Sequence, residues 1–261
     1  MKMHAVPALW RREVVKFVRD GNRVAGAMLQ PVVVWLLLGF GFRGSFRPPT
    51  PSGMDIPYLE FLFPGMIALV ALFTSIFSTI SIVEERHSGF LQAALAAPVR
   101  RLSLVLGAAL GSTTLAVGQG LLFFAVLPLT GHVPTLLGFV LMVGIMALVA
   151  FGFAAVGIVV AWQSRTTRGF HAVMNLCMIP LWVLSGAFFP AEGAPATLQW
   201  AIRLNPLSHG IAALRTAMYW PQDPPIDASS FALSLAVTGL FAAIMLILAA
   251  RTSRKSVREF R

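Results

Sequence analysis

The charged residues of this sequence are concentrated in short segments that separate long apolar stretches. Residues 61–83 and 102–164 contain no Asp, Glu, Lys or Arg, and the turn-forming sequence Gly-His-Val-Pro at 131–134 divides the longer stretch. A helix of about 20 apolar residues crosses the hydrocarbon core of a bilayer. The pattern therefore predicts six transmembrane helices, at about residues 24–42, 58–83, 102–130, 135–163, 169–189 and 228–250.

The composition excludes an ordinary soluble protein. The chain has 261 residues, of which 57% are hydrophobic and only 11% are charged. A soluble domain carries roughly a quarter charged residues, so this chain has too few polar groups to cover a water-exposed surface. We expect an all-α integral membrane protein whose residues 1–261 form a single transmembrane domain.

The N-terminal segment 7–20 has the pattern of an amphipathic helix. Its apolar residues at helical spacing are Trp10, Val14, Phe17 and Val18, and its basic residues, largely on the other face, are Arg11, Arg12, Lys16 and Arg19. This arrangement is typical of a helix that lies in the membrane interface. An ordinary solvated helix end would show a similar pattern and is the alternative.

Between the fifth and sixth predicted spans, residues 192–227 carry more apolar and aromatic side chains than a free loop needs. Asn205 followed by Pro206 predicts a helix start, with Asn as the N-cap and Pro at the first helical position. We expect two short helices that lie on the outer membrane face or dip into it as re-entrant helices. Arg203 and Arg215 are candidates for substrate contacts or, alternatively, for contacts with lipid headgroups.

The distribution of basic residues predicts the orientation in the membrane. With six spans, both termini lie on one side, together with the segments 84–101 and 164–168, and this side holds 16 of the 20 Lys and Arg residues. The positive-inside rule places this side in the cytoplasm. We expect a multi-pass protein of the cytoplasmic membrane with both termini cytoplasmic. The net charge of +10 arises from these flanking residues and does not indicate a nucleic-acid partner.

The sequence lacks the motifs of a catalytic or metal site. None of the three lysines lies in a phosphate-binding loop of the pattern G-x-x-x-x-G-K-[ST], the five histidines are scattered, and Cys177 is the only cysteine. No predicted span has a charged residue at its middle, where ion-coupled transporters usually carry one. We therefore expect this chain to be no enzyme and to hold no cofactor or metal. Active transport would need energy from another protein.

The segment 84–101, EERHSGFLQAALAAPVRR, is a charged interruption between two apolar stretches. Gly89 can end the preceding helix and Pro98 can stop the following one. The short helix between them would have an apolar stripe, with acidic residues before it and basic residues after it, the order that complements a helix dipole. Such a helix is suited to docking in the groove of a partner protein. The alternative is a plain turn whose arginines bind phospholipid.

Two groups of short motifs give this chain a resemblance to a known family. Residues 58–107 contain Pro64-Gly65 and the spaced set Glu84, Gly89, Pro98 and Arg101. Residues 180–215 contain SGAFFP at 185–190 and LNPL at 204–207. In this order and on this topology, the motifs resemble those of ABC-2 type permeases of ABC transporters, related to daunorubicin-resistance and lipooligosaccharide or polysaccharide export permeases. The sequence AALAAP at 93–98 departs from the bulkier or more polar residues common there.

The resemblance implies a permease subunit of an exporter in the lipid bilayer. A separate ATPase subunit would bind ATP and Mg²⁺, and two permease subunits, identical or different, would pair in a 2+2 complex. The short helix in segment 84–101 would couple the ATPase to the spans, and the outer hairpin would form a gate. The implied coupling residues are Glu84, Glu85, Gly89, Phe90, Leu91, Pro98, Arg100, Arg101, Arg165 and Arg168. The implied gate residues are Ser185, Gly186, Phe188, Phe189, Pro190, Asn205 and Pro206.

Two other classes of protein fit parts of the sequence. A secondary transporter or channel without an ATPase would explain the spans, and a membrane scaffold would explain the composition. Neither explains the exposed helix in segment 84–101 together with both motif groups. The substrate is not specified by the sequence, although aliphatic spans with scattered Phe favour an amphiphilic molecule.

Overall fold

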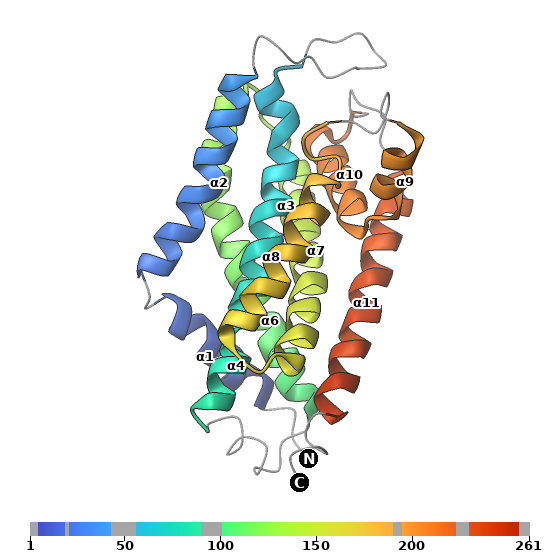
Figure 1. Cartoon of the computed structure of the whole chain (residues 1–261). Coiled ribbons are helices and arrows are strands. Elements are labelled where there is room, and N and C mark those ends of the chain that lie inside the picture. Colours follow the sequence, from blue (N-terminus) through green and yellow to red (C-terminus); the bar gives the residue numbers. More distant parts are fainter. Residues whose placement is uncertain are drawn as a thin grey trace.

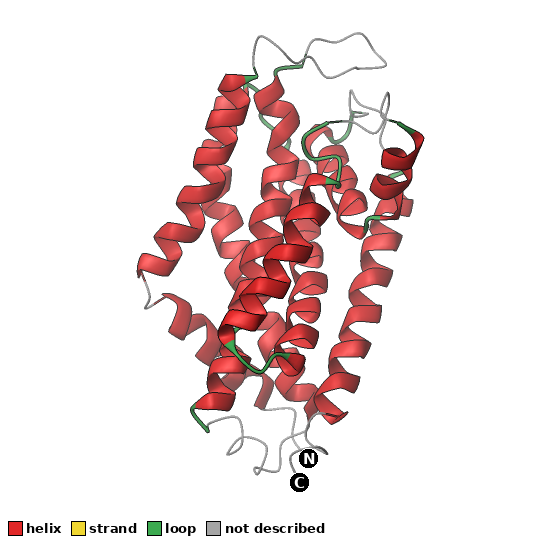
Figure 2. Ribbon diagram, in the orientation of Figure 1, coloured by secondary structure: helices red, strands yellow, loops and turns green. Residues whose placement is uncertain are grey.

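The computed structural model describes residues 5–18, 21–42, 56–89, 101–189, 195–222 and 230–255. All regular elements within these ranges are helices (Figure 2). They are α1 (Ala5–Val18), α2 (Gly21–Gly41), α3 (Tyr58–Ser78), α4 (Ser81–His87), α6 (Arg101–Phe123), the 3₁₀ helix η1 (Phe124–Thr130), α7 (Leu136–Gln163), α8 (Thr167–Val183), α9 (Ala196–Leu204), α10 (Pro206–Tyr219) and α11 (Phe231–Lys255).

The long helices form an elongated bundle around α3 (Figure 1). Helix α3 contacts α2, α6, α7, α8 and α10, whereas α11 packs on α7 and α10 at the side of the bundle. Helices α1 and α4 and the C-terminal end of α11 lie at one end, which we call the basic end. Helices α9 and α10 lie at the opposite end, which we call the hairpin end.

The core of the bundle is centred on α3, whose sequence is apolar on all sides, as expected for a helix enclosed by others. Of the apolar window in Tyr58–His87, 89% is buried inside the chain. An aromatic cluster joins three helices: the Trp35 ring meets those of Phe63 and Phe123 edge-on at 5.8 Å between centroids. The Trp35 indole N–H donates to the Leu59 carbonyl oxygen at 3.0 Å, which satisfies its only polar atom.

Four helical segments in the described ranges are long and apolar enough to cross a membrane: Tyr58–His87, Arg101–Thr130, Leu136–Gln163 and Phe231–Ser253. They coincide with four of the six predicted spans. The remaining two predicted spans correspond to α2 and to α8, which has 17 residues. The all-helical fold is therefore confirmed, and the count of six spans stays a prediction.

The predicted second span is not one continuous helix, because it breaks at Thr79–Ile80 between α3 and α4. The hydroxyls of Ser75, Ser78 and Thr79 each donate to the carbonyl oxygen three residues earlier, at 3.1, 2.8 and 2.7 Å. Side-chain bonds of this kind compete with the helical backbone pattern and bend helices. The chain then continues as α4 to His87, beyond the predicted end at 83.

The bounds predicted for the third span, 102–130, agree with the helical segment Arg101–Thr130, whereas the helix of the fifth span is shorter than predicted. The third span changes from α-helix to 3₁₀ helix at Phe124, within reach of Pro128, which lacks the N–H that an α-helix needs. The fifth span was predicted to reach 189, but α8 ends at Val183 and residues 184–189 form turns and bends. These non-helical residues contact α3, as described below.

Helix α1 packs on α6 rather than lying free of the bundle. An added Cβ at Gly107 of α6 would lie 2.7 Å from the Leu9 Cβ, so the missing side chain permits this close approach. The indole N–H of Trp10 donates to the Thr114 hydroxyl at 2.8 Å, and Trp10 is 38% exposed. Arg12, which the sequence places on the basic face of this helix, reaches Glu85 of α4.

Candidate functional site

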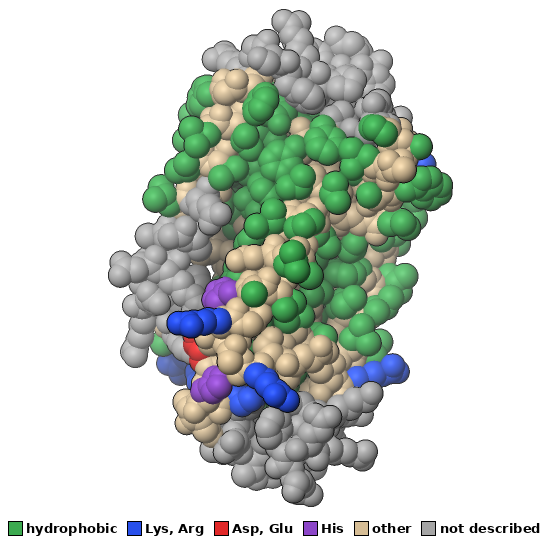
Figure 3. All heavy atoms as spheres, viewed as in Figure 1, with side chains coloured by type: hydrophobic (Ala, Val, Ile, Leu, Met, Phe, Trp, Pro, Cys, Tyr) green, Lys and Arg blue, Asp and Glu red, His purple; other side chains and the backbone are tan. Residues whose placement is uncertain are grey.

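Charged side chains gather at the basic end of the described structure. Figure 3 shows Lys, Arg, Glu and His side chains near this end, below a band of hydrophobic side chains over α7, α8 and α11. The short helix α4 lies among them and leads directly to residues 90–100, which fall outside the described ranges. The contacts of α4 therefore define where that segment is attached.

Glu85 connects α4 to α1 through an ion pair with Arg12. The distance from Arg12 Nη2 to Glu85 Oε1 is 2.5 Å, and the two side chains are 34% and 11% exposed, respectively. A cavity of about 40 Å³ between α1, α4, α6 and α7 has both side chains on its wall. Such a volume has room for water.

Arg86 connects α4 to the C-terminal end of α7. Its guanidinium donates to the carbonyl oxygens of Ala161, Trp162 and Ser164 at 3.3, 3.1 and 2.9 Å, and it lies 5.6 Å from the centre of the Trp162 ring. The last carbonyls of a helix have no partner within it. A cation at this position also interacts favourably with the helix dipole. Arg86 thus caps α7 from another helix.

His87 extends this attachment to the turn between α7 and α8. Its Nε2 lies 2.9 Å from the carbonyl oxygen of Arg165, and since a carbonyl only accepts, the imidazole is the donor. Three consecutive residues of α4 therefore contact three different parts of the bundle: Glu85 contacts α1, Arg86 contacts α7, and His87 contacts the α7–α8 turn.

The structure places the predicted coupling residues at or near this junction. Glu84 is exposed on α4, and Arg101 begins α6. The side chains of Arg165, in the α7–α8 turn, and Arg168, in the first turn of α8, are also exposed. Gly89 has a φ of +78°, a left-handed conformation that ends α4 and that other residues adopt at a cost. The remaining predicted coupling residues, Phe90, Leu91, Pro98 and Arg100, lie outside the described residues.

The residues around the predicted gate contact the N-terminal half of α3. An added Cβ at Gly65 would lie 2.7 Å from the Ala187 Cβ, so glycine is required for this approach. The indole N–H of Trp182 donates to the Gly65 carbonyl at 3.2 Å, and the Tyr58 hydroxyl donates to the Phe188 carbonyl at 3.1 Å. Gly65 of the first motif group therefore lies against Ala187 of the second.

The predicted gate residues lie in the contact region between α3 and residues 182–188, or next to it. Ser185 is buried and donates to the Trp182 carbonyl, Gly186 has a φ of +75°, and Phe188 packs edge-on against Trp182 at 4.5 Å. Phe189 is partly buried. Pro190 lies outside the described residues.

Asn205 has two functions in the α9–α10 hairpin. Its Oδ1 accepts from the Leu207 N–H at 3.0 Å, and Pro206 is the first residue of α10, so the predicted helix start is confirmed. Its Nδ2 donates to the carbonyl oxygens of Leu181 and Leu184 at 2.6 and 2.9 Å. One side chain thus begins α10 and ties it to the end of α8.

The two arginines of the hairpin occupy different environments. Arg215 is only 8% exposed, and its guanidinium carbon lies 4.7 Å from the centre of the Phe61 ring, with Nη2 3.4 Å from the Gly186 carbonyl oxygen. The interpretation that Arg215 reaches lipid headgroups is therefore wrong. Arg203 is exposed, so both interpretations of this residue stay predictions.

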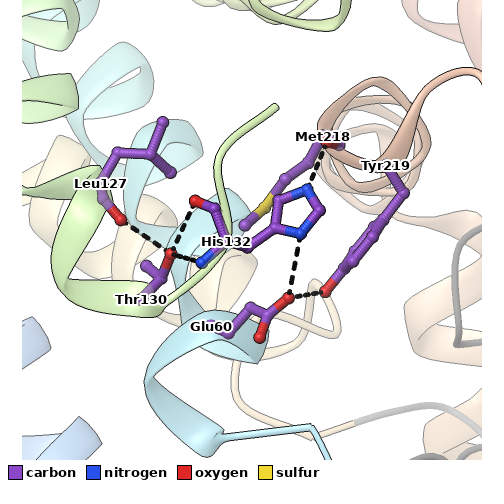
Figure 4. Close-up of polar contacts among 6 residues, drawn as sticks. All are labelled: Glu60, Leu127, Thr130, His132, Met218 and Tyr219. Atoms are coloured by element: carbon purple, nitrogen blue, oxygen red, sulfur yellow. Dashed lines mark hydrogen bonds and ion pairs between the residues drawn. The ribbon is translucent and has the colours of Figure 1, made fainter. Parts of the chain in front are cut away.

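A polar cluster at the hairpin end was not predicted from the sequence (Figure 4). The Tyr219 hydroxyl donates to Glu60 Oε1 at 2.5 Å, and the same oxygen lies 3.8 Å from Nδ1 of His132. The other ring nitrogen of His132 lies 3.0 Å from the Met218 carbonyl oxygen. The cluster joins the first turn of α3, the loop after η1 and the last turn of α10.

The ABC-2 type transporter family matches residues 4–219 of this chain. The chain belongs to the ABC-2 type transporter family. Among its relatives, Nodulation protein J of Sinorhizobium fredii is 29% identical over 217 residues, which cover 81% of this chain and 80% of the relative. The daunorubicin resistance ABC transporter permease protein DrrB1 of Streptomyces coeruleorubidus is 25% identical over 224 residues, which cover 81% of this chain and 73% of that protein.

Membership of the ABC-2 family establishes this chain as a multi-pass membrane component of a transporter, not itself catalytic. The family also implies an ABC ATPase subunit as the partner. In this ABC-2 chain, the matched region includes both the α4 junction and the hairpin-end contacts of α3. Sequence reasoning missed Arg12, Arg86 and His87 at the junction, because their partners lie 73 to 78 residues away.

Proposed function

We propose that this chain is the permease subunit of an ABC exporter. It moves a substrate across the cytoplasmic membrane, while a separate ATPase subunit binds ATP and Mg²⁺ and hydrolyses the nucleotide. The ABC-2 family match and the relation to a named resistance permease support this function. The absence of a phosphate-binding loop from the sequence is consistent with hydrolysis on another chain.

The observation that carries the proposal is the attachment of α4 to three parts of the bundle. Glu85, Arg86 and His87 fix this helix to α1, α7 and the α7–α8 turn, immediately before residues 90–100. A partner that moves the 90–100 segment would therefore displace α7 and α1 as well. A plain turn between two spans needs none of these contacts.

The proposed complex contains two permease subunits, identical or different, and two ATPase subunits. The basic end faces the cytoplasm with both termini, and the hairpin end faces outward. Residues 90–98 dock on the ATPase, with Arg165 and Arg168 at its edge. The Ser185–Pro190 region and the α9–α10 hairpin close the outer side, so movement of α7 relative to α3 would open it.

Purification of the complex tests the partner. The full chain, extracted from its own membrane in mild detergent, should carry a P-loop ATPase at about one copy per permease, as mass spectrometry would show. Leu91→Glu should prevent the ATPase from binding, because it places a charge on the apolar stripe predicted for the short helix in segment 84–101. Thr50→Glu, in the loop predicted on the other side, should not. Recovery of the permease without any ATPase, or an equal loss in both variants, would overturn the proposal.

The orientation can be tested separately by thiol labelling of intact cells. Cys177 is exposed, so the background variant is Cys177→Ala. In this background, Thr50→Cys should react with an impermeant maleimide, whereas Ser256→Cys should react only after the cells are permeabilised. The reverse pattern would show that the termini are external.

A further inference from the structure

His132 lies between a carbonyl oxygen and a carboxylate at the hairpin end (Figure 4). The left-handed Gly131, with a φ of +85°, and the Thr130 hydroxyl, which accepts from the His132 backbone N–H at 3.2 Å, set the course of the loop here. The imidazole also packs against the Tyr219 ring at 4.6 Å between centroids. The side chain is therefore held in one position by backbone and ring contacts.

The Met218 carbonyl oxygen determines which ring nitrogen carries the proton in neutral His132. This oxygen can only accept, so Nε2, at 3.0 Å, must be the donor. Neutral His132 then presents the lone pair of Nδ1 to Glu60 Oε1, and at 3.8 Å the two atoms form no hydrogen bond. A second proton on Nδ1 would turn this contact into an ion pair.

Glu60 is the group of the cluster that attracts a protonated His132, because Tyr219 remains neutral. Burial is the main cause that raises the pKa of Tyr219, and the hydrogen bond to Glu60 raises it further. The phenol therefore stays neutral and donates to the carboxylate. The positive charge of Arg215, also on α10, lowers the pKa of Tyr219 and so opposes these two effects. The titratable and charged groups at the site are thus Glu60 from α3, His132 from the loop, and Tyr219 and Arg215 from α10.

We propose that Glu60, His132 and Tyr219 form a proton-binding latch that holds α10 and the loop after η1 against α3. Binding of a proton at His132 Nδ1 adds an attraction to Glu60 while the Met218 and Tyr219 contacts remain. Histidine is the side chain that ordinarily changes charge between about pH 5 and 8. The hairpin end is therefore held more tightly in mild acid and less tightly as the pH rises.

The latch does not rest on the proposed ATPase partner or on the direction of transport. It is a property of the folded chain alone. The attraction to Glu60 exists only while the imidazole carries the second proton, so this contribution is present at low pH and is lost as the pH rises. This sign distinguishes the latch from carboxylates that lose their contacts when they are protonated in acid.

Thermal unfolding of the full chain in lipid nanodiscs tests the proposal. The quantity compared is the apparent unfolding midpoint at about pH 5.5 minus the midpoint at about pH 8. This difference should be larger in wild type than in Glu60→Gln or His132→Gln, by about 2–4 °C. The matched control is His209→Gln, since His209 is also in the hairpin but contacts the Arg203 carbonyl oxygen at 3.1 Å instead of a carboxylate. The control should keep the wild-type difference. Tyr219→Phe should lower both midpoints and keep most of the difference.

A second measurement protects the test against variants that fail to fold. Nuclear magnetic resonance of histidine-labelled wild type should show that the His132 ring signals change between about pH 5 and 8, the range in which histidine ordinarily changes charge. In Glu60→Gln this change should differ from that in wild type. A His132 that stays in one protonation state over this range would overturn the latch. An unchanged pH difference in Glu60→Gln would also overturn it.

Discussion

The ion pair between Arg12 and Glu85 should contribute measurably to the docking of α1 on α4. We consider Arg12→Glu and Glu85→Arg, first alone and then together. Each single variant places two like charges at positions where the oppositely charged atoms now lie 2.5 Å apart. The double variant restores a pair of opposite charges in reversed order.

The exposure of the two side chains sets the expected magnitude. A fully exposed pair stabilises a protein by about 0.2–1 kcal/mol, whereas breaking a buried pair costs about 3–5 kcal/mol. The pair is intermediate, because Glu85 is 11% exposed, Arg12 is 34% exposed, and the adjoining cavity has room for water. We therefore expect each single variant to lose about 1–2 kcal/mol, reduced for the screening around Arg12. This corresponds to about 2–8 °C in the unfolding midpoint.

The assay is thermal unfolding of the four proteins of the double-mutant cycle in nanodiscs. The double variant should recover at least half of the summed loss of the single variants, because contacting residues show non-additive effects. Arg11→Glu is the control, since it makes the same charge change at an exposed neighbouring position. Additive losses in the double variant, or an equal loss in the control, would refute the reasoning that this pair docks α1.

Three further predictions concern the two ends of the bundle. Arg86→Met should lower the unfolding midpoint more than Arg86→Lys, because it removes both the charge and all donors to the end of α7; equal losses would argue against capping. Gly89→Val should lower the unfolding midpoint more than Gly89→Asn, because Asn tolerates a left-handed φ better than Val. No atom lies within 4 Å of an added Cβ, so equal midpoints in the two variants would show that this φ is not maintained. Asn205→Asp keeps the N-cap acceptor but loses the donor to α8, so it should destabilise by about 1–3 kcal/mol in a denaturant titration, whereas a purely capping role predicts almost no loss.

Local signals in the sequence were the ones that could be interpreted correctly. The start of α10 was predictable because the cap residue Asn205 and the proline that follows it are adjacent in the chain. The positions of the long helices followed from apolar stretches, since a membrane span is defined by its own composition. The break at Thr79 also had a local signal, because three hydroxyl residues lie within about one and a half turns. The length of the apolar stretch, taken alone, predicts an unbroken helix there.

Contacts with distant backbone could not be predicted in the same way. Arg86 binds three carbonyl oxygens, and a carbonyl is present at every residue, so the sequence does not indicate which ones it reaches. Glu60 lies in the first turn of an apolar helix, and no residue near it in the sequence indicates its partners. Its partners His132 and Tyr219 are brought to it only by the packing of η1 and α10 beside α3.

Helix α7 is in contact with another helix at each of its ends. Its 28 residues extend for about 42 Å at 1.5 Å per residue. At the basic end Arg86 binds its last carbonyls, and at the hairpin end an added Cβ at Gly138 would lie only 2.6 Å from the Ala217 carbonyl oxygen of α10. Beside it, α3 and α4 are separated by a turn at Thr79–Ile80. Helix α7 therefore connects the α4 junction directly with α10 along a path that does not pass through this turn.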